Sequence, residues 1–335
     1  MPRRRRDPPA RVPARSRKGW IRIGISSCLL GEKVRWDGGH KRDGALTGLR
    51  ESGVVWVPVC PETEVGMGVP REPVRLVGRS SSPRMVGVRS ENDWTGRMER
   101  YARGWVQRAA RLKLSGYVLK SDSPSCGMER VRVNAARGGP THEGVGLFAR
   151  ALLEGMPLLP VEEERRLGDA AIRENFLERV LAFRRWQNRR ASGCARGDLA
   201  AFHAAHELQI LSHSPRHCRA LEYLVSSACG GSAERLTDRY GVLFMAALRI
   251  PATIPGHLRV LRRLSRLLRG RLTPGEIRRI RDALDGYRRG VVRRAVPLAL
   301  LRRHVAHQEF RALRHQVYLV PDPRELILRQ RAKIW

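Results

Sequence analysis

Three cysteines stand far apart in the chain, and each lies in a polar or proline-marked loop that follows a short apolar stretch. They are Cys28 in Ser26–Gly31, Cys60 in Val59–Glu62 and Cys126 in Ser123–Gly127. A fold can gather three thiolates at one point, and thiolates are soft ligands that select iron–sulfur clusters or zinc. A cluster with three cysteine ligands keeps one iron open to a substrate. The pattern therefore indicates a site for chemistry.

The first half of the chain alternates strand and helix signals. Short β-branched or apolar runs over 21–25, 54–59 and 116–120 predict strands, and apolar residues at helical spacing from Met98 to Leu112 predict a helix. This alternation favours an α/β fold with a parallel sheet, in which the loops at the carboxyl ends of the strands form the binding crevice. Each cysteine follows one predicted strand, so we expect a Rossmann-like domain that brings the three together.

The second half of the chain predicts helices almost throughout. Residues 158–161 are consistent with a last strand, and proline and glycine residues separate the later segments. Helices are expected over 199–211, 216–227, 239–248, 257–269, 274–288 and 297–314. The predicted organisation is a disordered basic arm over 1–19, an α/β domain over 20–165, a linking helix over 166–192 and an all-helical domain over 193–335.

Charge narrows the class of partner. The chain has 65 Lys and Arg residues against 32 Asp and Glu, a formal charge of +33, and most of the cations are arginine. Arginine makes two-point contacts with phosphate oxygens, so the excess favours a polyanion as partner, although a genome that encodes much arginine raises the arginine content of every protein.

No apolar run approaches the roughly 20 residues that cross a bilayer. Without a signal peptide or a disulfide framework, we expect a cytoplasmic protein with no membrane partner.

The predicted helix over 257–269 separates its charged and apolar residues. One face carries the arginines Arg259, Arg262, Arg263 and Arg266, and the other is rich in leucine. The arginine face is either the solvated surface of a bundle helix or a surface that follows a phosphate backbone. Because basic residues recur in helix after helix, nucleic acid is the favoured partner. An anionic membrane fits less well, since no aromatic face accompanies the charge.

The segments around the cysteines resemble a known family. Similarity to the TudS-like thiouracil desulfidases is carried by Ser27–Gly39, Val59–Glu62, Val69–Pro73, Leu119–Gly127 and Val161–Leu167. The YbgA-type domain, often fused to that family, is resembled by Phe202–His206, Ser212–Pro215, Val296–Leu298 and Tyr318–Pro321. The two-domain combination resembles the RudS-type desulfidases of 4-thiouridine in transfer RNA, and the two resemblances together cover roughly residues 20–330.

The resemblance implies a cubane 4Fe-4S cluster held by Cys28, Cys60 and Cys126. Its fourth iron would bind the sulfur of a thiocarbonyl as a Lewis acid, so that water replaces sulfur on the ring carbon without net electron transfer. The resemblance implies thiolated tRNA as both the substrate and the partner. It implies no particular oligomeric state. Two alternatives stay open: the same reaction on free thiouracil bases, and a nucleic-acid-binding or redox-sensing protein that catalyses nothing.

A hydrolytic reaction of this kind needs a group that moves protons. Glu62, two residues after Cys60, is the first candidate, although it could instead cap the helix or turn that follows. Ser121, Ser123 and Ser125 could bond cluster sulfurs or the base, and they equally suit a tight loop.

Weaker candidates complete the predicted site. Asp37 is a candidate for ring recognition and Arg71 for a phosphate contact. The acidic run Glu162–Glu164 is explained at least as well by the N-terminus of a helix as by a metal site. The cysteines without ligand spacing are expected to pack as small apolar residues. They are Cys194, Cys218 and Cys229.

Three histidines recur on one predicted helical face, at His203, His206 and His213. A zinc site is disfavoured because no paired-cysteine arm accompanies them. They fit either a polar seam that faces RNA or the active site, or ordinary hydrogen bonds between helices.

Overall fold

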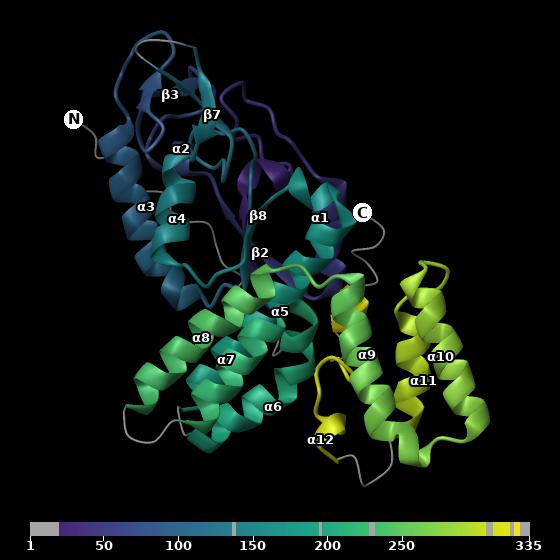
Figure 1. Ribbon diagram of the computed structural model, residues 1–335. Coiled ribbons are helices and arrows are strands. Elements are labelled where there is room, and N and C mark those ends of the chain that lie inside the picture. Colours follow the sequence, from purple (N-terminus) through teal and green to yellow (C-terminus); the bar gives the residue numbers. More distant parts are fainter. Residues whose placement is uncertain are drawn as a thin grey trace. The chain divides into compact units, whose positions relative to one another are not determined.

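The computed structural model describes residues 20–135, 139–193, 196–227, 232–305, 311–321 and 325–328 (Figure 1). The chain divides into two compact units: the first contains the described residues up to Phe176 together with Ile327 and Leu328, and the second spans Leu177–Leu326. This division falls within α5 (Ala170–Ala191), inside the stretch for which the sequence predicts a linking helix. The predicted basic arm over 1–19 lies outside the described residues.

Four parallel strands form the central sheet of the first unit. They are β1 (Ile21–Ser26), β2 (Val54–Val59), β5 (Gly116–Leu119) and β8 (Val161–Glu163), in the order β2-β1-β5-β8. The side chains of β5 are all buried and those of β1 almost all, as expected for strands covered on both faces. The parallel α/β sheet predicted from the sequence is confirmed.

Two helices, α3 (Thr95–Ala109) and α4 (Leu147–Gly155), pack against each other in the first unit (Figure 1). Trp105 on α3 meets the ring of Tyr117 in β5 edge to face, with the ring centroids 5.6 Å apart. Gly24 in β1 makes room for that tyrosine, because a Cβ at this position would lie 2.2 Å from the ring. Aromatic packing therefore fixes α3 and β1 around the strand that leads to Cys126.

A second sheet in the first unit was not predicted from the sequence. Its strands are β3 (Val74–Arg79), β4 (Ser82–Gly87), β6 (Val131–Asn134) and β7 (Thr141–Gly144), in the order β4-β3-β6-β7. The β3–β6 pair is parallel and the other two pairs are antiparallel. These strands are short and mix apolar residues with arginine, glycine or polar residues, so none forms a continuous apolar run.

Short helical segments connect the strands of the first unit. They are η1 (Ser27–Leu30), α1 (Gly44–Gly48), η2 (Leu49–Ser52), α2 (Pro61–Glu64), η3 (Ala110–Leu112) and η4 (Arg166–Gly168). Two of them, η1 and α2, begin at the carboxyl ends of β1 and β2, where the sequence predicts the first two cysteine loops.

Helices make up the second unit, as predicted. After α5 they are α6 (Arg196–His213), α7 (Pro215–Ser226), α8 (Ala233–Arg249), α9 (Ile254–Leu268), η5 (Arg269–Arg271), α10 (Pro274–Arg288), α11 (Ala295–Val305) and α12 (Arg311–Arg314). Ser214, Thr253 and Thr273 cap α7, α9 and α10 by accepting backbone hydrogen bonds. The single helix predicted over 297–314 is described as two segments, with 306–310 outside the described residues.

The two faces predicted for α9 are confirmed. Its buried face joins α10 and α11 in an apolar core through Leu258, Val260, Leu261, Leu264 and Leu268. On the other face Arg259, Arg262 and Arg266 are exposed. Arg263 is partly exposed and pairs with Glu207 of α6, with 2.7 Å between the charged atoms.

The histidines of α6 bond to neighbouring helices and to the backbone inside the second unit. His203 Nδ1 lies 3.2 Å from the hydroxyl of Tyr240 on α8, and His206 Nε2 accepts from Arg185 Nε of α5 at 3.0 Å. Burial, reinforced by the charge of Arg185, lowers the pKa of His206 to about 3. Of the alternatives left open by the sequence, these contacts match hydrogen bonding between helices.

One helix pair in the second unit has an unusual hydropathy. In the part of the chain that the structure describes, no single helix is both long and apolar enough to cross a membrane. By length and composition α8 and the following segment Ile254–Arg271 pass that test together, with a bend of 114° between them.

The buried pair of His213 and Glu178 makes the stability of the second unit depend on pH. Burial opposes protonation of His213, but the carboxylate of Glu178, 3.3 Å away, and the carbonyl of Ile250 outweigh it and raise the pKa, against a smaller opposing effect of Arg294. A raised pKa gives stability that is complete below about pH 6.5 and is lost as the pH rises through the folded-state value.

We therefore expect Glu178→Gln to lower the free energy of unfolding by on the order of 2 kcal/mol at about pH 6, and by less at about pH 9. Urea unfolding of the full chain at both pH values measures this difference. The neutral His206 is common to both proteins, so its effect cancels in the comparison. An equal loss at the two pH values would contradict the assignment of an ion pair.

Candidate functional site

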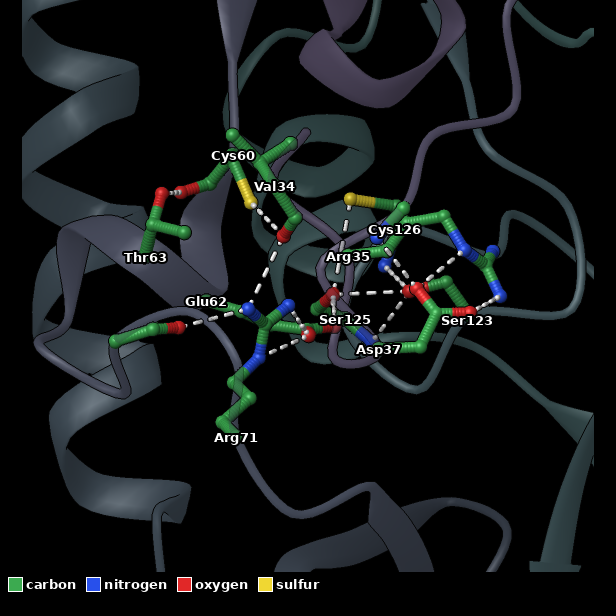
Figure 2. A network of polar contacts seen from close by, with 12 residues as sticks. Val34, Arg35, Asp37, Cys60, Glu62, Thr63, Arg71, Ser123, Ser125 and Cys126 are labelled. Atoms are coloured by element: carbon green, nitrogen blue, oxygen red, sulfur yellow. Dashed lines mark hydrogen bonds and ion pairs between the residues drawn. The ribbon is translucent and has the colours of Figure 1, made fainter. Parts of the chain in front are cut away.

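The loops that follow β1, β2 and β5 enclose a cavity of about 460 Å³. Cys28 lies two residues after β1, Cys60 directly follows β2 and Cys126 lies in the loop after β5, and all three line the cavity as free thiols. Figure 2 shows Cys60 Sγ directed toward the carbonyl oxygen of Val34, and Cys126 Sγ in contact with Ser125 Oγ. The structure thus brings together the three cysteines that the sequence singles out.

Burial raises the pKa of all three thiols. For Cys28 the value reaches about 11, even though Lys120 and Arg35 nearby act in the opposite direction. A metal group that binds thiolates supplies positive charge, which offsets the cost of ionising buried thiols. The three sulfur donors therefore fit a metal centre, although among the described residues no three His, Cys, Asp or Glu side chains are close enough to hold a single ion.

Glu62 in α2 is held from two sides (Figure 2). Its Oε1 accepts a hydrogen bond from Ser125 Oγ at 2.6 Å, and its Oε2 accepts from Arg71 Nε at 3.1 Å and also from Arg71 Nη2. Ser125 Oγ lies 2.9 Å from Ser123 Oγ. Glu62 does not cap α2. Instead, a chain of hydroxyls joins its carboxylate to Ser123, and such a chain can carry a proton.

Ser121 belongs to a second polar network on the same cavity. Glu164, directly after β8, accepts from Ser121 Oγ at 2.8 Å, from the Ser121 N–H at 2.7 Å and from Lys120 Nζ at 2.5 Å. The expectation that Glu162–Glu164 begins a helix is wrong. Glu162 and Glu163 belong to β8, and Glu164 is the first residue after that strand. Glu164 lies beside Lys120 because β8 pairs in parallel with β5, which no local sequence pattern indicates.

The remaining predicted residues differ in their relation to the cavity. Asp37 is exposed and lies outside the cavity lining, and a hydrogen bond from the Gly39 N–H at 2.9 Å, helped by Arg35, lowers its pKa. Arg71 does line the cavity. Its guanidinium group donates to the carboxylate of Glu62 and to the carbonyls of Val34 and Gly68.

Several cavity residues were not predicted from the sequence. They include Arg35, Trp36, Lys41, Lys120, Asp122 and Arg165. Trp36 is 44% exposed, so an aromatic ring borders the cavity on its solvent side. Of the cysteines expected to be apolar packing residues, Cys218 is buried, and Cys194 and Cys229 lie outside the described residues.

Comparison with protein families agrees with this site. Residues 23–164 match the model of the 2-thiouracil desulfurase family. The chain carries a 2-thiouracil desulfurase domain. Residues 207–323 match DUF1722, a family described as being of unknown function. The resemblance to a TudS-like domain fused to a YbgA-type domain is confirmed, and every cavity residue except Arg165 lies within the desulfurase domain.

Two individual proteins are similar to the desulfurase domain. The chain is 28% identical over 162 residues to the uncharacterized protein YbbK of Bacillus subtilis (strain 168), which covers 47% of this chain and 98% of that protein. Among solved structures, the 4Fe-4S-dependent thiouracil desulfidase TudS is similar, with 27% identity and a TM-score of 0.36 over 44% of this chain and 93% of that one.

The Cys126 loop is fastened to the start of α4, where Gly146 packs against its backbone. Gly146 N donates to the carbonyl of Gly127 at 2.8 Å, and a Cβ at residue 146 would lie 2.5 Å from the carbonyl of Ser125. We expect Gly146→Ala to displace the loop and to lower the free energy of unfolding by about 1–3 kcal/mol. The matched control is Gly168→Ala, where a Cβ meets nothing within 4 Å. Equal losses in both variants would contradict this role of Gly146.

Proposed function

We propose that this protein replaces sulfur by oxygen in thiolated uridine of transfer RNA, at a site where Cys28, Cys60 and Cys126 hold a 4Fe-4S cluster. The match to the desulfurase family supports a desulfidase. The observation that carries the site is that three free cysteines, from the ends of three parallel strands, line one cavity within the matched residues. The choice of 4-thiouridine and of RNA follows from the sequence resemblance and from the charge of the helical unit.

The reaction balances without an oxidant or a reductant. Water oxygen forms a bond to the ring carbon, the carbon–sulfur bond breaks, and the two water protons leave with the sulfur as hydrogen sulfide. When bound, a cluster with three thiolate ligands supplies an open iron that acts as a Lewis acid toward the thiocarbonyl sulfur. The protein itself has to orient the ring and handle the protons.

Glu62 and the loop serines carry the proton in this proposal. The carboxylate of Glu62 accepts from Ser125, which lies 2.6 Å away, and Ser125 connects it to Ser123 on the cavity. A proton lost by the attacking water can therefore pass to Glu62 through hydroxyl groups. Ser121 Oγ donates to Glu164 and accepts from Lys120 Nζ. Its oxygen is therefore a fixed polar group in the second polar network of the cavity.

Anaerobic reconstitution with iron and sulfide, followed by incubation with transfer RNA that contains 4-thiouridine, tests the function. We expect the thiouridine absorbance to fall with the wild type and not with Cys60→Ala. Removing one of three ligands lowers both the iron bound and the rate. The matched control is Cys218→Ala, a buried cysteine of the second unit, which leaves both unchanged.

The assay also separates the alternative functions. Turnover of free 4-thiouracil but not of the RNA would replace the proposed substrate by a free base. No turnover of any thiolated pyrimidine by the reconstituted wild type would contradict the desulfidase and favour a protein that binds or senses.

The exposed arginines of α9 are the proposed RNA contacts in the second unit. We expect the triple change Arg259→Gln, Arg262→Gln and Arg266→Gln to weaken binding of transfer RNA and to flatten its salt dependence. Each phosphate contact contributes roughly 0.7–0.9 to the slope of log K against log salt, so losing three lowers the slope by about 2. Filter binding at several salt concentrations measures both effects, and turnover of free 4-thiouracil stays unchanged.

A matched control removes the same charge elsewhere. Arg97, Arg100 and Arg108 are exposed on α3 of the first unit, and their change to Gln lowers the net charge equally. An equal loss of slope in this control would show that RNA responds to net charge and not to the arginine face of α9.

A further inference from the structure

We propose that Arg71 is a positioning residue that acts through Glu62 and does not bind substrate phosphate. The inference rests on the proposed desulfidase function, and it deepens the account of that same site. It replaces the phosphate contact for which Arg71 is a candidate in the sequence. The bonds of its guanidinium group carry the argument.

The side chain of Arg71 is largely covered although it lines the cavity. Its side chain is 5% exposed, and that of Glu62 is 13% exposed. Nε and Nη2 both donate to the same oxygen of Glu62, Oε2. Nη1 donates to the carbonyls of Val34 at 3.0 Å and Gly68 at 2.9 Å. Most N–H groups of the guanidinium therefore donate within the protein, and a phosphate would have to displace the half-buried carboxylate of Glu62.

Backbone contacts hold Arg71 in place before any ligand binds. Its own N–H donates to the carbonyl of Trp36 at 2.9 Å. Gly68 has a φ of 77°, a conformation that favours glycine, and this turn brings its carbonyl to the guanidinium group. The Val34 carbonyl also lies 3.7 Å from Cys60 Sγ. Arg71 thus joins two segments around the cavity, the one after η1 that holds Val34 and Trp36 and the one between β2 and β3 that holds Glu62 and Gly68.

This anchoring determines which oxygen of Glu62 is used. With Oε2 taken by Arg71, Oε1 is the oxygen that accepts from Ser125. Because Ser125 donates to Glu62, its oxygen is left to accept from the hydroxyl of Ser123, 2.9 Å away. The N–H of Cys126 donates to Ser123 Oγ at 3.1 Å, which fixes that hydroxyl too. Arg71 therefore sets the direction of the whole hydroxyl chain from the cavity to Glu62.

A structural experiment tests this independently of activity. Crystal structures of Arg71→Gln and Arg71→Lys, prepared like the wild type, show whether Glu62 still accepts from Ser125. We expect the contact to be lost in the Gln variant, since an amide cannot hold the carboxylate, and kept in the Lys variant, which retains one charged donor. A Gln variant in which Glu62 and Ser125 are unmoved overturns the proposal, whatever the protein catalyses.

Kinetics of the reconstituted protein supply the second test. We expect Arg71→Gln to lower kcat by roughly 100-fold, the scale of one proton-transfer group, with little change in KM. Arg71→Lys restores part of the loss. In the background of Glu62→Gln, the change Arg71→Gln adds little, because two residues that act as a unit are not additive. Iron content equal to that of the wild type shows that the cluster is retained.

The control is Arg75→Gln, in β3 just beyond the cavity lining. Arg75 pairs with the exposed Glu91, and we expect kcat and KM to stay at wild-type values. A rise in KM for Arg71→Gln, or a full additional loss on top of Glu62→Gln, overturns the proposal and restores a direct substrate contact. An inactive wild type contradicts the proposed function instead, and the two crystal structures then decide the role of Arg71.

Discussion

Parallel pairing of β1 with β2 and β5 is the constraint on which the site depends. Parallel strands end at the same edge of a sheet, so the segments that follow them are forced together however far apart they lie in the sequence. Ser26 is paired with Val59, which sets Cys28 and Cys60 beside one another. The fit of Tyr117 against Gly24 fixes the neighbouring strand, and with it the approach of the Cys126 loop.

Paired charges then fasten the loops to one another. Around the cavity Glu62 pairs with Arg71, Glu164 with Lys120 and Asp122 with Arg165. The last two pairs join the segment after β5 to the one after β8, and the first closes the segment between β2 and β3 on itself. Removing one partner of a buried pair leaves an uncompensated charge, which costs several times more than an exposed pair contributes. The first two pairs, which are largely buried, therefore give the cavity walls a rigidity that short loops alone lack.

The sequence predicted the parts of the fold that have a strong periodic signal. Short β-branched or apolar runs indicated β1, β2 and β5, and the leucine face of α9 indicated a bundle helix. The second sheet was not predicted because arginine and polar residues interrupt its strands, so that no alternation of apolar and polar residues is recognisable. Lys120 and Glu164 escaped for another reason: each is an ordinary charged residue until β5 and β8 pair, and a contact across 44 positions leaves no local pattern. Arg71 was noticed, but its partners are visible only in three dimensions.

The order of the strands along the chain has a consequence for biosynthesis. The cavity is lined by residues between Ser26 and Arg165, and β8, which pairs with β5 and directly precedes Glu164, is the last strand of its sheet to leave the ribosome. Until then Lys120 lacks the carboxylate that neutralises it. Because the N-terminal part of a chain generally folds first during synthesis, the cavity can reach its final charge balance while the arginine-rich helices are still being translated.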